Sequence, residues 1–108
     1  MIAVIFEALP NEGQQENYLA TAEHLRAYLI TQSGFISIER FQSLSEPTKL
    51  LSLSFWQDET AVRLWREQSD HRQAQQAGQE SVFADYRLRV AQVMRDYGRF
   101  DRAQAPAD

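Results

Sequence analysis

The stretch that decides the fold runs from Gly34 to Gly78 and reads GFISIERFQSLSEPTKLLSLSFWQDETAVRLWREQSDHRQAQQAG. In its first half, large apolar and polar side chains alternate with a period of two on either side of a turn at 43–47. That pattern is typical of a β-hairpin. In its second half, apolar residues recur at helical spacing. The stretch therefore predicts two paired strands followed by helix.

The two hairpin strands, expected near 35–41 and 51–56, differ on their two faces. The apolar residues that share one face of each strand are Ile36, Ile38, Leu51, Leu53 and Phe55. We expect this face to cover the core, and the mixed serine face to be buried only against a second subunit. Trp56 ends its strand and is expected at an edge or a subunit contact. Glu39 and Arg40, charged residues in mid-strand, are expected to form an inter-subunit ion pair.

The helical half reads as two pieces. Asp58 is placed to cap a helix that carries Trp65 on its apolar side. Asp70 resembles the cap of a second, shorter helix that ends at Gly78. We therefore expect a broken helix with a kink near residues 68–69.

Upstream of the hairpin, residues 2–9 (IAVIFEAL) are apolar on both faces, as expected for a strand well inside a sheet. Pro10 ends this strand because proline has no N–H to donate. Asn11 is expected to cap the following helix, which Gly34 stops. The buried stripe of that helix is predicted to be Tyr18, Ala22, Leu25 and Leu29.

Periodicity leaves the segment 83–97 open between helix and strand. Helical spacing fits Phe83, Tyr86, Val90, Val93, Met94 and Tyr97. A strand with Tyr86, Leu88 and Val90 on one face and arginines on the other fits almost as well. Residues after Gly98 form a polar tail without a structural signal.

Length and composition exclude several classes of function. The 108 residues fit one domain with a modest core, so a partner subunit would help to enclose a pocket. A formal net charge of −4 argues against nucleic acid as a partner. The absence of cysteine excludes disulfides and thiolate chemistry. With no apolar run long enough for a membrane and no signal peptide, a cytoplasmic protein without membrane contact is expected.

Motifs for phosphate or metal binding are missing from the sequence. The four glycines are scattered at turns, and neither histidine, His24 or His71, has a partner at metal-ligand spacing. His71 is the better candidate for proton transfer, although a solvated helix residue is the simpler interpretation. Trp65 fits either core packing or the wall of a pocket for a planar ligand.

Nearly the whole chain, residues 2–97, resembles the antibiotic biosynthesis monooxygenase (ABM) domain of the dimeric α+β barrel superfamily. The residues that carry the resemblance are Gly34-Phe35, the 51–56 strand, Trp65 and His71-Arg72-x-Ala74-Gln75. It implies a ferredoxin-like βαββαβ α+β fold with an antiparallel sheet, a strand at 85–97, and a domain at 1–98 followed by a tail at 99–108. It also implies a homodimer whose two sheets pack together, often with an exchanged C-terminal strand or tail.

By the same resemblance, the function is a cofactor-independent monooxygenase. Such an enzyme oxidises a small hydrophobic aromatic, polyketide or quinol-type compound with molecular oxygen. The first site residue implied is Trp65, followed by His71 and Tyr86. No metal or other cofactor is implied. The alternative is a non-catalytic dimeric module that binds a small molecule in the same cavity, since a fold does not fix a function.

One branch of the family degrades haem with an Asn on the first strand, a Trp and a haem-binding His. Trp65 matches the Trp, but Gln75 stands at the histidine position. The first strand has Phe6 and Glu7 and no Asn. Haem degradation is therefore not expected.

Overall fold

The computed structural model describes residues 1–74 and 82–107, except for the side chains of 69–74. The chain order is strand, helix, strand, strand, helix, strand. The elements are β1 (Ile2–Pro10), α1 (Gln15–Leu29), β2 (Phe35–Gln42), β3 (Leu50–Trp56), α2 (Glu59–Ala74) and β4 (Phe83–Gln92). This is the predicted βαββαβ order, and it shows that the C-terminal segment is a strand.

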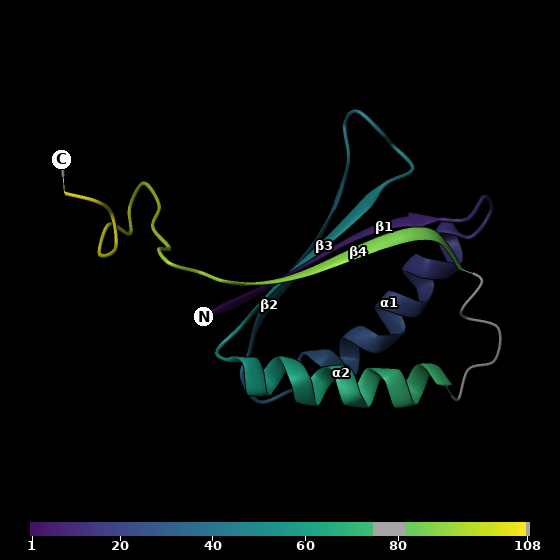
Figure 1. Ribbon diagram of the computed structural model, residues 1–108, viewed down its shortest axis with the longest axis horizontal. Helices are drawn as coiled ribbons and strands as arrows, with labels where there is room; N and C mark the ends of the chain where they lie inside the picture. The colour runs from purple at the N-terminus through teal and green to yellow at the C-terminus, as the bar shows by residue number, and fades with distance from the viewer. Residues whose placement is uncertain (75–81, 108) are drawn as a thin grey trace.

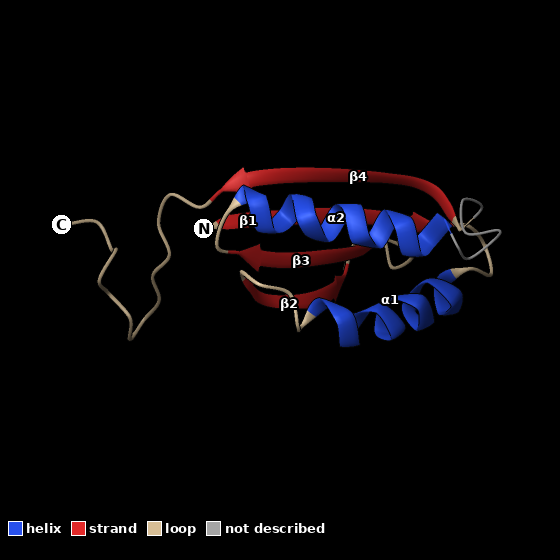
Figure 2. Cartoon of the chain, turned by 90° about the horizontal axis from the view of Figure 1, so that it is seen from below, coloured by secondary structure: helices blue, strands red, loops and turns tan. Residues whose placement is uncertain are grey.

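The four strands form one antiparallel sheet in the order β2-β3-β1-β4. Both helices lie on the same side of the sheet (Figures 1 and 2). The arrangement is the ferredoxin-like fold expected from the sequence. On the other side of the sheet, called here the open face, neither of the two described helices lies over the strands (Figure 1). Among the described residues, no helix is long and apolar enough to cross a membrane.

Helix α1 buries the stripe that its sequence predicts. Tyr18, Ala22 and Leu29 are buried, and the fourth predicted member, Leu25, is half-buried. The predicted cap was wrong, because the N-cap residue is Gln14, where no side-chain capping hydrogen bond is made. The carbonyl of Asn11 instead accepts the Gln14 N–H at 2.9 Å, so a turn of the backbone leads into the helix.

Helix α2 is continuous from Glu59 to Ala74, so the predicted kink near residues 68–69 was wrong. Neither proline nor glycine interrupts this span, and residues typical of caps are tolerated inside a helix when nothing breaks it. The cap by Asp58 is confirmed, because its Oδ1 accepts the Ala61 N–H at 2.9 Å. The predicted helix end at Gly78 lies outside the described residues.

The predicted faces of β3, the second strand of the hairpin, were reversed. On β3, the buried residues are those that alternate with the large aliphatic ones, namely Leu50, Ser52, Ser54 and Trp56. Leu51, Leu53 and Phe55 lie on the open face and are half-buried. A period of two identifies two faces but does not tell which of them the helices cover.

A bulge at the start of β2 separates Ile36 from Ile38, which were predicted to share a face. Phe35 pairs with Trp56 and Ser37 pairs with Phe55, so Ile36 is the extra residue. Phe35 and Ile38 pack with the helices, whereas Ile36 is 48% exposed. An extra residue shifts the alternation of the strand by one.

Two clusters of buried side chains make up the core. One contains Ala8, Tyr18, Leu50 and Val82. The other contains Leu29, Trp56 and Ala61, with half-buried neighbours around it. Trp56 is only 2% exposed and donates its indole N–H to the Ser54 hydroxyl at 3.0 Å. The prediction of an edge or subunit position for Trp56 was therefore wrong.

Strand β4 begins and ends earlier than the predicted 85–97. Its last residue, Gln92, pairs with Ile2, the first residue of β1. Beyond that point β1 offers little further backbone to pair with, which explains the earlier end. The chain then continues as a tail that leads away from the sheet (Figure 1). The tail contains its own turn, in which the Gly98 N–H donates to the Asp101 carbonyl at 2.8 Å.

Gly34 stands at a close approach between the turn before β2 and helix α2. Its φ is +83°, and a Cβ there would lie 2.7 Å from the Ala61 Cβ. We expect Gly34→Ala to destabilise the protein more than Gly13→Ala, by about 1–3 kcal/mol. Gly13 is a matched control, because its φ is +81° and a Cβ there would meet nothing within 4 Å.

Urea denaturation of the two variants measures this difference, since the cost of the left-handed backbone is common to both. The double variant Gly34→Ala/Ala61→Gly should recover part of the loss by removing the facing methyl group. Equal unfolding free energies for the two single variants would contradict the steric explanation.

Candidate functional site

The strand register aligns side chains into rows across the helix-facing side of the sheet. The central row runs Arg40, Ser52, Phe6, Leu88 from β2 to β4. Directly opposed residues in antiparallel strands share a face. Phe6 contacts Tyr18 of α1, with ring centroids 6.5 Å apart, so this row lies on the side of the helices.

The two core clusters lie on either side of this central row. On β3, Leu50 belongs to one cluster and Trp56 to the other. Between them stand Ser52 and Ser54, which are small and polar. On β3 the two clusters are therefore separated by two buried serines.

Strand β4 adds apolar side chains that the helices leave uncovered. Tyr86, Leu88 and Val90 are 60%, 51% and 44% exposed. Their pairing with Ala8, Phe6 and Val4 places them on the helix-facing side. Together with the central row they form a surface that we call the helix-facing strip, made of Phe6, Arg40, Ser52, Tyr86, Leu88 and Val90. The strip offers aromatic and aliphatic contacts to a flat ligand.

Trp65 lies on α2 and is half-buried. It packs against the cluster of Leu29, Trp56 and Ala61. The side chain thus contributes to the core while part of it stays accessible.

Tyr86 lies on β4 and is part of the helix-facing strip. Its ring centroid is 5.6 Å from that of Phe6 and 5.8 Å from that of Phe83. Its backbone N–H donates to the Asp85 carboxylate at 2.8 Å. The aromatic contacts hold the ring at the sheet, and its 60% exposure leaves it able to contact a ligand.

His71 lies in α2, three residues before the helix ends at Ala74. Its side chain is outside the described residues, as is the whole of Gln75. The end of α2, in the helix layer, and the start of β4, in the sheet, lie at the same end of the domain (Figures 1 and 2), and Tyr86 is three residues after the start of β4. His71 and Tyr86 thus belong to the same end of the domain, while Trp65 packs with the cluster at the other end.

Sequence reasoning missed Phe6 and Ser52, and it gave Arg40 a different role. The signal for Phe6 was the alternation of Ile2, Val4 and Phe6, which places all three on one face. Ser52 could not be found, because its face of β3 was expected to point away from the helices.

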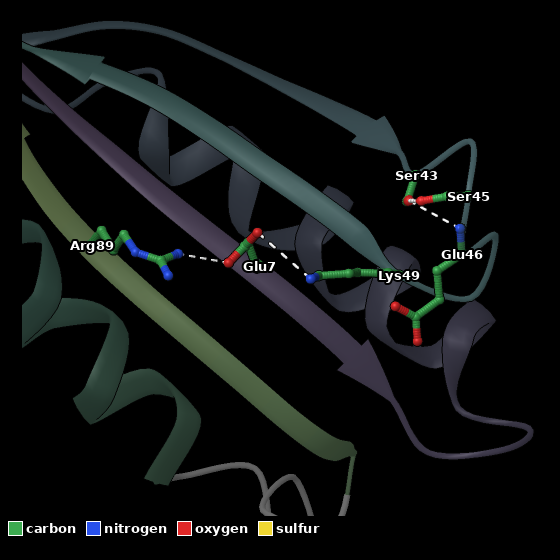
Figure 3. A network of polar contacts seen from close by, with 6 residues as sticks. All are labelled: Glu7, Ser43, Ser45, Glu46, Lys49 and Arg89. Carbon is green, nitrogen blue, oxygen red and sulfur yellow. Dashed lines mark hydrogen bonds and ion pairs between the residues drawn. The ribbon is translucent and has the colours of Figure 1, made fainter.

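The open face carries a charged group at its centre (Figure 3). The carboxylate of Glu7 accepts a hydrogen bond from Arg89 Nη1 at 2.6 Å and lies 3.6 Å from Lys49 Nζ. The hydrogen bond from Arg89 and the charge of Lys49 lower the pKa of Glu7 below its ordinary value of 4.5. Arg89 comes from β4 and Lys49 precedes β3, so this network ties together both neighbours of β1.

Beside that network, β3 and β1 contribute apolar side chains to the open face. Leu51, Leu53 and Phe55 of β3 lie beside Ile5 of β1, which pairs with Leu53. A shallow hollow of about 430 Å³ lies at the end of this face where the tail begins. Its lining residues are Met1, Ile36, Ser37, Phe55, Val93, Arg95 and Asp96. This hollow is on the side of the sheet away from the helix-facing strip.

Comparison with known proteins agrees with this architecture. The family model described as antibiotic biosynthesis monooxygenase matches residues 1–77. The chain therefore belongs to the antibiotic biosynthesis monooxygenase family, as its sequence suggested.

Among curated proteins, the chain is 47% identical over 93 residues to the jasmonate monooxygenase ABM of Pyricularia oryzae. The match covers 86% of this chain and 43% of the fungal protein, so the chain spans less than half of that relative's length. It is 29% identical to the YqjZ protein of Bacillus subtilis, over 86% of this chain and 79% of the relative. The solved structure of Rv0793 from Mycobacterium tuberculosis shares the fold, with a TM-score of 0.76 and 15% identity over 90% of this chain and 98% of that chain.

The Glu7 network predicts a defined dependence of stability on pH. A lowered pKa in the folded state contributes stability above the unfolded pKa, and that contribution is lost as the pH falls through the folded pKa. We expect Glu7→Gln to be less stable than the parent at pH 7 and the difference to disappear in acid, below the ordinary value of 4.5. Denaturant unfolding at a series of pH values checks this.

Glu39→Gln is the matched control, because Glu39 is an exposed glutamate on the same face in the neighbouring region of the sheet. It should show little of this difference. A Glu7→Gln penalty that stays constant from pH 7 into acid would show that the ion pairs do not cause it.

Proposed function

We propose that this protein is a cofactor-independent monooxygenase that oxidises a small aromatic, polyketide or quinol-type compound with molecular oxygen. Membership of the family supports the reaction class. The observation that carries the substrate class is the helix-facing strip, where Phe6, Tyr86 and Leu88 offer an apolar surface for a planar ring.

The chemistry needs little from the protein when the substrate is readily oxidised. In an anthrone, the ring CH₂ becomes C=O, one atom of O₂ enters the carbonyl, and the other leaves in water with the two hydrogens. The reaction is balanced without an external reductant. The deprotonated substrate supplies the electrons, and the protein supplies a shaped site with little water and a group to accept the proton.

We assign roles to three residues on this basis. His71 accepts the proton, because imidazole changes charge near neutral pH. Trp65 forms a wall against which the ring stacks, and its indole N–H is a donor. Tyr86 is part of the strip, and its hydroxyl can donate a hydrogen bond to the substrate or accept one from it.

The curated relative from Pyricularia oryzae widens the range of candidate substrates. It is named as a jasmonate monooxygenase, so jasmonate belongs in the substrate panel beside quinols and anthrones. Hydroxylation of an unactivated carbon consumes two further electrons, so a reductant such as NADPH has to be supplied in that arm of the assay.

We further propose that the protein acts as a homodimer joined through the open face. Leu51, Leu53 and Phe55 form an apolar surface there, and neither α1 nor α2 covers it. The internal pairing of Glu7 with Arg89 and Lys49 allows this face to be buried without leaving that carboxylate unpaired. A second copy of the sheet is the partner that the family resemblance implies.

Oxygen uptake by metal-free, flavin-free protein tests the enzymatic proposal. With an anthrone or quinol, the rate should exceed spontaneous oxidation, and Trp65→Ala should lower it by about 10-fold or more if stacking positions the ring. Trp65→Phe should retain more activity, because it keeps an aromatic wall. Thermal unfolding of each variant separates loss of the site from loss of the fold.

Unchanged turnover in folded Trp65→Ala would remove Trp65 from the site. Saturable ligand binding without oxygen uptake across the whole panel would favour the alternative, a non-catalytic module that binds a small molecule.

The homodimer is tested by a charge placed in the open face. Leu53→Glu should convert the dimer to monomer in sedimentation velocity at micromolar concentration, because it places an unpaired charge in an apolar interface. Leu19→Glu is the control, since Leu19 lies on α1, on the other side of the sheet, and is 39% exposed. A parent protein that sediments as a monomer would refute the proposed dimer.

A further inference from the structure

Arg40 has an unusual environment on the helix-facing side of the sheet. The residue lies in mid-strand on β2, opposite Ser52, and it is half-buried. Its Nε is buried and has no hydrogen-bond partner among the described residues. No ion pair within the described part of the chain joins Arg40 to a carboxylate.

A buried donor without an acceptor is costly for a protein. The loss of hydration is on the order of 1–3 kcal/mol and is larger for a charged group. Such groups are uncommon in folded proteins and often mark a position where an ion, water or ligand binds. The sequence suggested an inter-subunit ion pair, but Arg40 lies on the helix-facing side, away from the open face on which Glu39 pairs with Leu53.

We propose that Arg40 binds an anionic group, a carboxylate above all, of a ligand whose apolar part lies on the helix-facing strip. The inference deepens the proposed function, because it rests on the same site and adds a charge to the substrate class. An arginine can donate from Nε and a terminal nitrogen to the two oxygens of one carboxylate, and this geometry satisfies the buried Nε.

The row geometry fits a ligand of this kind. Two strand spacings, about 10 Å, separate the backbone of Arg40 from that of Phe6, and Leu88 is one spacing further. The intervening residue on β3 is Ser52, whose side chain is short, carries a hydroxyl and is 9% exposed. A ring over Phe6 and Leu88 with a short acidic arm toward β2 therefore spans the row.

Binding measurements with a matched pair of probes test the proposal without any turnover. We would titrate 1-naphthaleneacetic acid and its neutral methyl ester into the full chain by calorimetry at pH 7. The parent should bind the acid more tightly than the ester. Arg40→Met should weaken the acid about tenfold or more, the factor expected for a lost charge-assisted hydrogen bond, and leave the ester unchanged.

Two further variants separate recognition from fold stability. Arg40→Lys keeps the charge but lacks the Nε donor, so its affinity for the acid should lie between those of the parent and Arg40→Met. Arg63→Met removes an exposed arginine of α2 and should change nothing. The melting temperature of ligand-free Arg40→Met should equal or exceed that of the parent, because a buried unpartnered donor has been removed.

The proposal is overturned if the parent does not prefer the acid to the ester. It is also overturned if Arg40→Met weakens both probes equally or lowers the melting temperature of the ligand-free protein, because Arg40 would then serve the fold. Absence of oxygen uptake with preserved, Arg40-dependent binding of the acid would count against the proposed oxidation alone.

Discussion

The side chains of β3 decide which face of the sheet the helices cover. Trp56 lies beneath them with Leu29 and Ala61, and its indole N–H is satisfied by the Ser54 hydroxyl at 3.0 Å. Because side chains alternate along a strand, burying Trp56 commits Ser54 and Ser52 to the same side. Leu51, Leu53 and Phe55 must then face the other way. A slip of one residue against β1 would exchange the two sets.

This arrangement has two consequences for function, one on each face. Under the helices, the residues of β3 that lie between the two core clusters are buried serines rather than large apolar residues. On the open face, the aliphatic residues of β3 remain for another surface to cover. The same strand therefore contributes to both proposals, the ligand site on one side of the sheet and the surface for association on the other.

The sequence was sufficient to predict the order of the elements, the class of sheet and the buried stripe of α1. These features depend on local signals, namely the spacing of apolar residues and the positions of glycine and proline. It was insufficient to predict which face of β3 the helices cover, because alternation fits either orientation. The bulge at Ile36 could not be predicted either, because no residue type in this segment signals it. The end of β4 was misplaced because it depends on where β1 begins, which is a long-range constraint. Of the candidate site, Trp65 and Tyr86 could be proposed from the sequence because they are aromatic residues. Ser52 and Arg40 could not, because only the strand register places them in one row with Phe6.

The contrast between Glu7 and Arg40 follows from the same register. Both are charged residues in the middle of a strand, where charge is unusual. Glu7 lies on the open face within reach of Arg89 and Lys49, so its charge is compensated inside one subunit. Arg40 lies on the opposite face, in the row of Ser52 and Phe6, and none of the described residues accepts from its buried Nε. Because the charge of Glu7 is already compensated, the proposed second subunit can cover that face without leaving the carboxylate unpaired. Because the charge of Arg40 is not compensated, the proposed ligand has to supply an anionic group beside the apolar strip.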